Sequence, residues 1–80
     1  MRRCAWFQFA LPGPGRTRLE IYDSSGRLVR TLADREFAAG EHRIIWNGVD
    51  AQGHRAARGL YFLRLNTQRG QESRRIVVID

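Results

Sequence analysis

The fold is decided by residues 40–65, which read Gly-Glu-His-Arg-Ile-Ile-Trp-Asn-Gly-Val-Asp-Ala-Gln-Gly-His-Arg-Ala-Ala-Arg-Gly-Leu-Tyr-Phe-Leu-Arg-Leu. Two segments of this stretch alternate between apolar and polar positions. The residues that share one face are His42, Ile44 and Trp46 in the first segment and Tyr61, Leu63 and Leu65 in the second. A period of two is the spacing of a β-strand with one buried face. The stretch therefore predicts two strands, joined by a loop that is rich in turn residues.

The rest of the chain follows the same pattern. Turn residues recur at intervals of roughly 8–12 residues, with no helical periodicity between them, which favours an all-β sandwich. The further predicted strands span Trp6–Leu11, Thr17–Tyr22, Arg27–Leu32 and Glu72–Ile79. We therefore expect six strands, or seven if Ala33–Gly40 or Gly53–Ala57 also pairs.

The segment after Gly26 is the least regular. Its apolar residues Leu28, Val29 and Leu32 do not alternate cleanly, which predicts a bulge or an edge strand. The one helical element that the pattern allows is a short helix over Ala33–Ala38, and so short a helix is marginal in isolation.

Two loops share the pattern Asp-x-x-Gly, at Asp23–Gly26 and Asp50–Gly53. An aspartate side chain caps such a turn and glycine supplies its positive φ. A calcium ion takes about six to eight oxygen ligands, whereas each loop offers one carboxylate. We therefore predict turns here, and no metal or cofactor.

Composition limits the classes of function. The 80 residues are enough for one small domain, predicted over residues 6–80, after an N-terminal extension over residues 1–5. All 14 basic residues are arginine, and the net charge of +6 attracts polyanions without specificity. Acidic residues are interleaved with the arginines on nearly every segment, which favours solvated faces over a specific nucleic-acid site. The single cysteine, Cys4, is predicted to be a plain thiol.

Nothing in the chain indicates an enzyme or a membrane span. A nucleophile relay needs a serine or cysteine, a histidine and an acid in contact, and the serines lie in turns or at a strand start, away from His42 and His54. The apolar run Ile76–Ile79 is far shorter than the roughly 20 residues of a transmembrane helix. Trp46 is predicted to lie in the core, and Trp6 to be partly covered.

From Phe7 onward, the order and spacing of several motifs resemble the immunoglobulin-like domain of the flagellar hook-capping protein. The same pattern is similar to the C-terminal sorting domain of the type IX secretion system. The matching segments are Phe7–Pro12 with Gly15, Leu19–Asp23 with Gly26, Arg27 and Val29, and Arg74–Val77. The central motif residues are Gly40, His42, Trp46, Gly48, Asp50, Gly53, Gly59 and Tyr61. The Asn-Pro element that usually precedes a sorting domain is absent.

The resemblance implies an antiparallel immunoglobulin-like β-sandwich of six to seven strands and two possible roles. The leading role is a non-catalytic C-terminal module of an exported bacterial protein, used for secretion sorting or cell-surface attachment. The strand read by the secretion machinery would comprise Arg74, Arg75, Ile76, Val77 and Val78. The alternative is a structural hook-capping domain in flagellar assembly. Under either role we expect protein partners, a monomeric module of a larger chain, and a place in the periplasm, on the outer membrane or outside the cell.

The structural motif that the resemblance implies is carried by turn residues and two aromatic rings. Its residues are Asp23, Gly26, Gly40, Trp46, Gly48, Asp50, Gly53, Gly59 and Tyr61.

Overall fold

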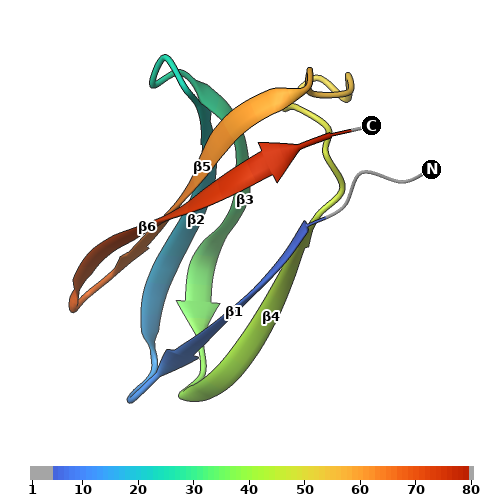
Figure 1. Cartoon of the computed structure of the whole chain (residues 1–80). Coiled ribbons are helices and arrows are strands. Elements are labelled where there is room, and N and C mark those ends of the chain that lie inside the picture. Colours follow the sequence, from blue (N-terminus) through green and yellow to red (C-terminus); the bar gives the residue numbers. More distant parts are fainter. Residues whose placement is uncertain (1–4, 80) are drawn as a thin grey trace.

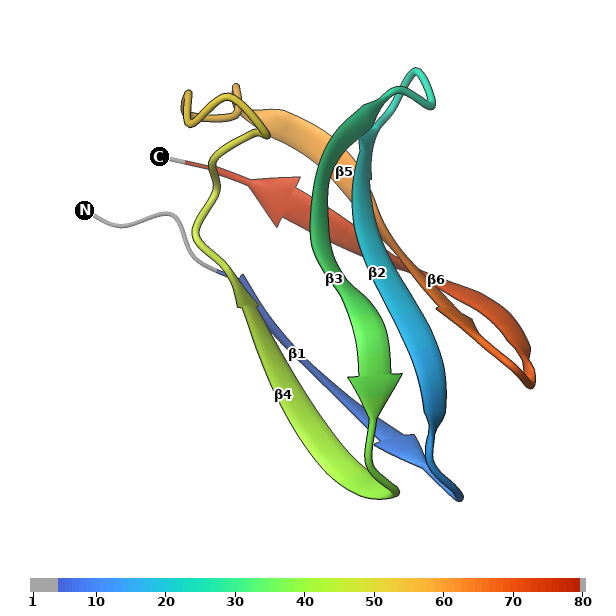
Figure 2. The same cartoon turned by 180° about the vertical axis from the view of Figure 1, so that it is seen from behind.

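The computed structural model describes residues 5–79, which form six strands and no helix. The strands are β1 (Ala5–Leu11), β2 (Gly15–Asp23), β3 (Leu28–Phe37), β4 (Gly40–Trp46), β5 (Gly59–Thr67) and β6 (Gly70–Val78). They form two antiparallel sheets, one of β1 and β4 and one in the order β3-β2-β5-β6. Figures 1 and 2 show the β1–β4 pair facing the larger sheet. The predicted all-β antiparallel sandwich is confirmed.

The N-terminal extension predicted over residues 1–5 lies outside the described residues, apart from Ala5, which begins β1. Cys4 and Asp80 also lie outside the described range. No helix among the described residues has the length and hydrophobicity needed to cross a membrane.

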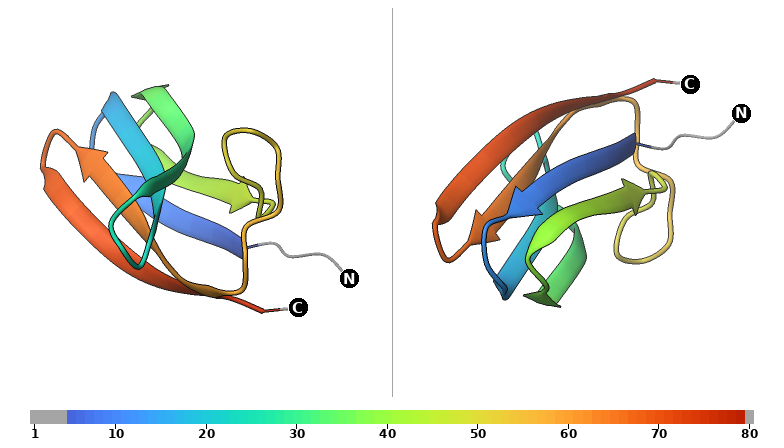
Figure 3. Two further views of the ribbon diagram at one scale, coloured as in Figure 1. Left: turned by 90° about the horizontal axis from the view of Figure 1, so that it is seen from above. Right: turned by 90° about the horizontal axis from the view of Figure 1, so that it is seen from below.

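The core lies between the two sheets and is built by the alternation read from the sequence. Figure 3 shows this two-layer arrangement from above and below. Alternate side chains of β1, β4 and β5 face inward, whereas β3 buries only Phe37, and Ala56 comes from the loop between β4 and β5. The buried apolar residues are Phe7, Phe9, Leu11, Leu19, Ile21, Phe37, Trp46, Ala56, Tyr61, Leu63, Leu65, Ile76 and Val78. Burial of these side chains drives the two sheets together, since each fully buried large side chain contributes about 1.5–3 kcal/mol.

Trp46 and Tyr61 meet at one end of this core. Their ring centroids are 5.6 Å apart at an interplanar angle of 61°, an edge-to-face contact. The indole Nε1 donates to the carbonyl oxygen of Val49 at 2.9 Å, and the Tyr61 hydroxyl donates to that of Ala57 at 2.6 Å. Because both polar ends bind the loop between β4 and β5, the ring pair holds this loop as well as the core.

A second ring cluster lies where β3 meets β4. Phe9, Phe37 and His42 have centroid separations of 5.0–5.4 Å. The His42 Nε2 atom lies 2.7 Å from the carbonyl oxygen of Ala38. His42 therefore serves as a half-buried packing residue, as its place in the strand pattern predicts.

The third strand is longer than the sequence predicts. The helix expected over Ala33–Ala38 is wrong, because residues 33–37 belong to β3 and pair with β2 from Leu19 back to Gly15. Two register shifts opposite β3 and its position at the sheet edge agree with the irregularity expected there. Residues 53–57 supply one isolated bridge, between Val49 and Arg55, and no seventh strand.

Candidate functional site

The expected partner strand, Arg74–Val78, lies on β6 at the edge of the larger sheet. Ile76 and Val78 point into the core, so they are not free to bind a partner. Arg74 donates from Nη1 to the carbonyl oxygen of Gln8 at 2.9 Å. This bond links β6, at the edge of the larger sheet, to β1 in the other sheet, so Arg74 helps to hold the two sheets together. Arg75 and Val77 remain exposed.

The two Asp-x-x-Gly loops form the same turn. Asp23 Oδ1 accepts hydrogen bonds from the backbone N–H groups of Ser25 and Arg27 at 3.0 and 2.9 Å. Asp50 Oδ1 accepts equivalent bonds from Gln52 and His54 at 3.0 and 2.9 Å. The closing glycines, Gly26 and Gly53, have φ values of 90° and 88°, a region that disfavours other residues. Both carboxylates therefore act on their own turns.

These hydrogen bonds favour the charged form of each aspartate. The Ser25 hydroxyl and then the Arg27 N–H hold the pKa of Asp23 below its ordinary value. The His54 N–H and then the Gln52 N–H lower the pKa of Asp50 in the same way. The stabilisation is therefore present above the ordinary aspartate pKa of about 3.9 and is lost as the pH falls through the lower folded values.

We expect the melting temperature to fall as the pH is lowered from about 5 to about 2. In the double variant Asp23→Asn/Asp50→Asn this decline should be shallower, because the amide keeps an acceptor oxygen but does not titrate. Thermal unfolding followed by circular dichroism over this pH range makes the comparison. Equal slopes for the wild type and the double variant would contradict the assignment.

The outer face of the β1–β4 sheet carries an exposed apolar pair. Trp6 and Ile45 lie directly opposite each other in the strand register, and they are 59% and 63% exposed. The Arg43 guanidinium lies over the Trp6 ring, 4.8 Å from its centroid. We call Trp6, Arg43 and Ile45 the β1–β4 patch. Trp6 is thus only partly covered, as the sequence predicts.

A second exposed pair lies on the outer face of the larger sheet. Leu60 and Val77 are opposite each other on β5 and β6, and Val77 is 64% exposed. Sequence alternation places Trp6, Ile45 and Leu60 opposite the inward-facing residues of their strands, but it does not say which strands are neighbours. The pairing of Trp6 with Ile45 joins strands far apart in the chain, so it could not be found from either segment alone.

Comparisons with known proteins identify the relatives of this sandwich. The family model described as the FlgD Ig-like domain matches residues 5–71. A crystal structure of FlgD from P. aeruginosa is similar with a TM-score of 0.71 and 22% identity, covering 94% of this chain and 59% of that one. FlgD from Xanthomonas campestris is similar with a TM-score of 0.66 and 29% identity, covering 95% of this chain and 56% of that one. A search of curated proteins gave no match.

These matches correct the functional expectation drawn from the sequence. The secretion-sorting role is wrong, because the matching family is that of the flagellar protein FlgD and both similar structures are FlgD proteins. The family match also ends before the Arg74–Val78 strand on which the sorting role depended. With 67 residues matched, from 5 to 71, this chain belongs to the FlgD Ig-like domain family.

Proposed function

We propose that this chain is a structural, non-enzymatic domain of a hook-capping protein and that it contacts protein subunits during flagellar assembly. The observation that carries the proposal is the family match over residues 5–71. The similar FlgD from Xanthomonas campestris supports it, since that protein is linked to the hook capping that is essential for flagellar assembly. The chain spans 59% and 56% of the two similar structures, so the partners of a whole hook-capping protein are part of the proposal.

The surface that we assign to subunit contact is the β1–β4 patch. Tryptophan and arginine are the residue types most enriched among the residues that dominate protein interfaces. Trp6 and Ile45 project from a sheet whose other face is the packed core, so they are presented on a rigid support. Because these two large apolar side chains are exposed to solvent in the free domain, a partner that covers them would gain the free energy of burying apolar surface.

The proposal places the domain outside the cytoplasm, on the growing flagellum. Its contacts with subunits would be formed and broken as the hook lengthens, so a patch of a few side chains is better suited than a large permanent interface. Small interfaces of this kind, below about 1,200 Å², are typical of transient complexes.

Deletion of the domain tests this role. In the bacterium that carries the gene, we expect an in-frame deletion of the codons for residues 5–79 to abolish hook growth and swimming. Electron microscopy of isolated flagellar bases, with swimming in soft agar, measures the result. A plasmid copy of the intact gene should restore both. Hooks of normal number and length in the deletion strain would contradict the proposed function.

A further inference from the structure

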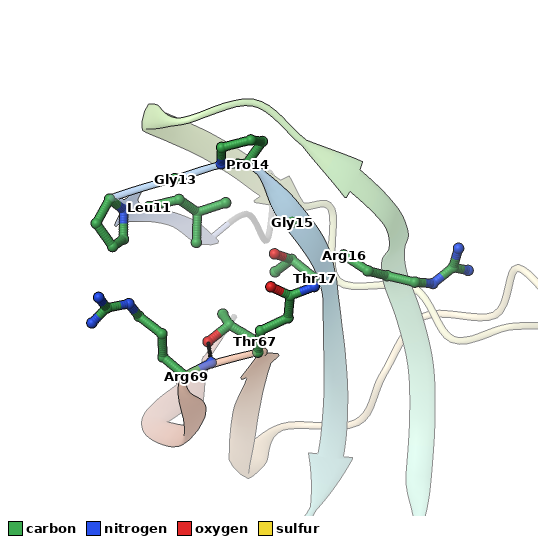
Figure 4. Close-up of a pocket in the computed structure, with 10 residues that line it drawn as sticks. Leu11, Gly13, Pro14, Gly15, Arg16, Thr17, Thr67 and Arg69 are labelled. Atoms are coloured by element: carbon green, nitrogen blue, oxygen red, sulfur yellow. Dashed lines mark hydrogen bonds between the residues drawn. The ribbon is translucent and has the colours of Figure 1, made fainter.

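A pocket of about 270 Å³ lies at the end of the sandwich where the β1–β2 loop meets the β5–β6 turn. Its wall on the loop side is Leu11, Pro12 and Pro14, and its wall on the turn side is Gln68 and Arg69. Figure 4 shows the Arg69 side chain extending from the turn along the open side of the pocket, toward the segment that contains Leu11 and Gly13. One half of the lining is thus apolar and the other half carries polar and cationic groups.

A buried hydroxyl without a partner borders this pocket. Thr17, on β2, is 1% exposed, and its Oγ1 atom has no hydrogen-bond partner among the described residues. Figure 4 shows this oxygen on the side of β2 that faces the pocket. A buried hydroxyl that is left unpaired destabilises the fold, whereas valine would fill the same space without that cost. A ligand atom that accepts a hydrogen bond from this hydroxyl would remove that cost.

A second unpaired buried atom lies on β5, the neighbour of β2 in the larger sheet. Asn66 Nδ2 is buried and has no partner within the described part of the chain. It borders an adjoining pocket of about 220 Å³, which shares Arg16, Thr67 and Gln68 with the larger one. Because Asn66 pairs with Arg18, the residue after Thr17, its side chain lies on the other face of the sheet and borders the second pocket only.

The positively charged side chains that line the pocket favour an anionic ligand. Arg16 is already engaged, since its Nε lies 3.1 Å from Asp34 Oδ1. The Arg69 guanidinium has no ion pair or hydrogen bond within residues 5–79. A guanidinium with free donors binds a carboxylate with favourable geometry. The apolar wall of Leu11, Pro12 and Pro14 would cover the methylene groups that carry such a carboxylate.

We propose that this pocket binds a glutamate side chain from an extended acidic segment of a protein partner. Arg69 would pair with the carboxylate, the Thr17 hydroxyl would donate to it, and the prolines would pack against its stem. The volume is below the roughly 300–1,000 Å³ of small-molecule sites, and it suits one residue of a peptide. The net charge of +6 complements an acidic partner. The inference rests on the proposed function for the existence of a partner chain.

The test is a titration of the isotope-labelled 80-residue chain with capped tripeptides, followed by two-dimensional NMR. We expect Gly-Glu-Gly to shift the amide signals of residues in the β1–β2 loop and the β5–β6 turn. Gly-Gln-Gly, which has the same shape without the charge, should bind at least about tenfold more weakly, because a hydrogen bond to a charged group is worth about 1.5–3 kcal/mol. Equal shifts from both peptides would overturn the proposal.

Two variants test the residues that we expect to bind the glutamate, and a third variant serves as a matched control. Thr17→Val and Arg69→Gln should each weaken Gly-Glu-Gly binding by about tenfold. Thr17→Val should also melt at or above the wild-type temperature, because it removes an unpaired buried hydroxyl. Arg55→Gln removes the same charge in the loop between β4 and β5, where Arg55 pairs through its backbone with Val49, and it should leave binding unchanged.

Three results would contradict the pocket assignment. The first is that Thr17→Val binds Gly-Glu-Gly as tightly as the wild type does. The second is that Arg55→Gln loses as much affinity for this peptide as Arg69→Gln. The third is that inorganic phosphate binds to the protein as tightly as Gly-Glu-Gly. The last would identify a general anion site and not a glutamate site. If the peptide fails to bind while deletion of the domain abolishes hooks, the pocket is wrong and the assembly role stands. If the peptide binds while hooks are normal without the domain, the assembly role is wrong.

Discussion

Replacing Trp46 with alanine is expected to remove most of the protein's folding free energy at room temperature, whereas the same replacement at Trp6 should remove little of it. Trp46 is 1% exposed and packs against Tyr61, while its indole N–H holds the loop at Val49. Truncation of a buried tryptophan costs about 3–5 kcal/mol. That is close to the whole stability of a small domain, which is about 5 kcal/mol at the lower end of the usual range.

Trp6 is the internal control for this result. It is the other of the two tryptophans, and its side chain is 59% exposed. Its loss removes a cross-strand contact with Ile45 and the contact with Arg43, together worth less than about 2 kcal/mol. Urea unfolding followed by far-ultraviolet circular dichroism compares the two variants without relying on tryptophan fluorescence. A similar loss of stability in both would contradict the core that we describe.

The double variant Trp6→Ser/Ile45→Ser is expected to abolish hook assembly while the domain stays folded. Residues that dominate an interface each contribute about 2 kcal/mol or more, so losing two should weaken subunit contact by on the order of a thousandfold. Hooks per cell, counted by electron microscopy in a strain carrying the variant in place of the wild-type gene, measure the effect. Circular dichroism of the purified variant establishes that it folds.

A matched control separates this surface from exposed apolar residues in general. Leu28 is 49% exposed and lies on β3, in the other sheet. Leu28→Ser should leave the number of hooks unchanged. Normal hook numbers in the Trp6→Ser/Ile45→Ser strain would contradict the assignment of the β1–β4 patch to subunit contact. Loss of hooks in the Leu28→Ser strain as well would mean that the defect is not specific to the patch.

Much of this architecture can be predicted from the sequence because the alternation is strong where a strand covers the core. The inward faces of β4 and β5 follow directly from the spacing of Trp46 and of Tyr61, Leu63 and Leu65. The turns at Asp23 and Asp50 follow from side-chain chemistry that acts within four residues. In both cases the interactions are local, so the local sequence contains the information.

The features that the sequence does not predict all depend on pairing between distant segments. Residues 33–37 have the composition of a short helix, but pairing with β2 gives them backbone hydrogen bonds that an isolated helix of this length could not match. The sequence suggests that residues 74–78 act together as one binding strand. In the structure, Ile76 and Val78 lie in the core and the other residues of this strand lie on the surface. The pocket near Thr17 is closed by a turn that comes from the other end of the chain.

The central claim is that this domain works at the growing flagellar hook. The most direct measurement is immunoelectron microscopy of cells with hooks in the course of assembly, using an antibody raised against the purified domain. We expect gold label at the distal ends of short, growing hooks, and none in the strain that lacks codons 5–79. Label spread over the cell surface, with hook ends unlabelled, would contradict the claim.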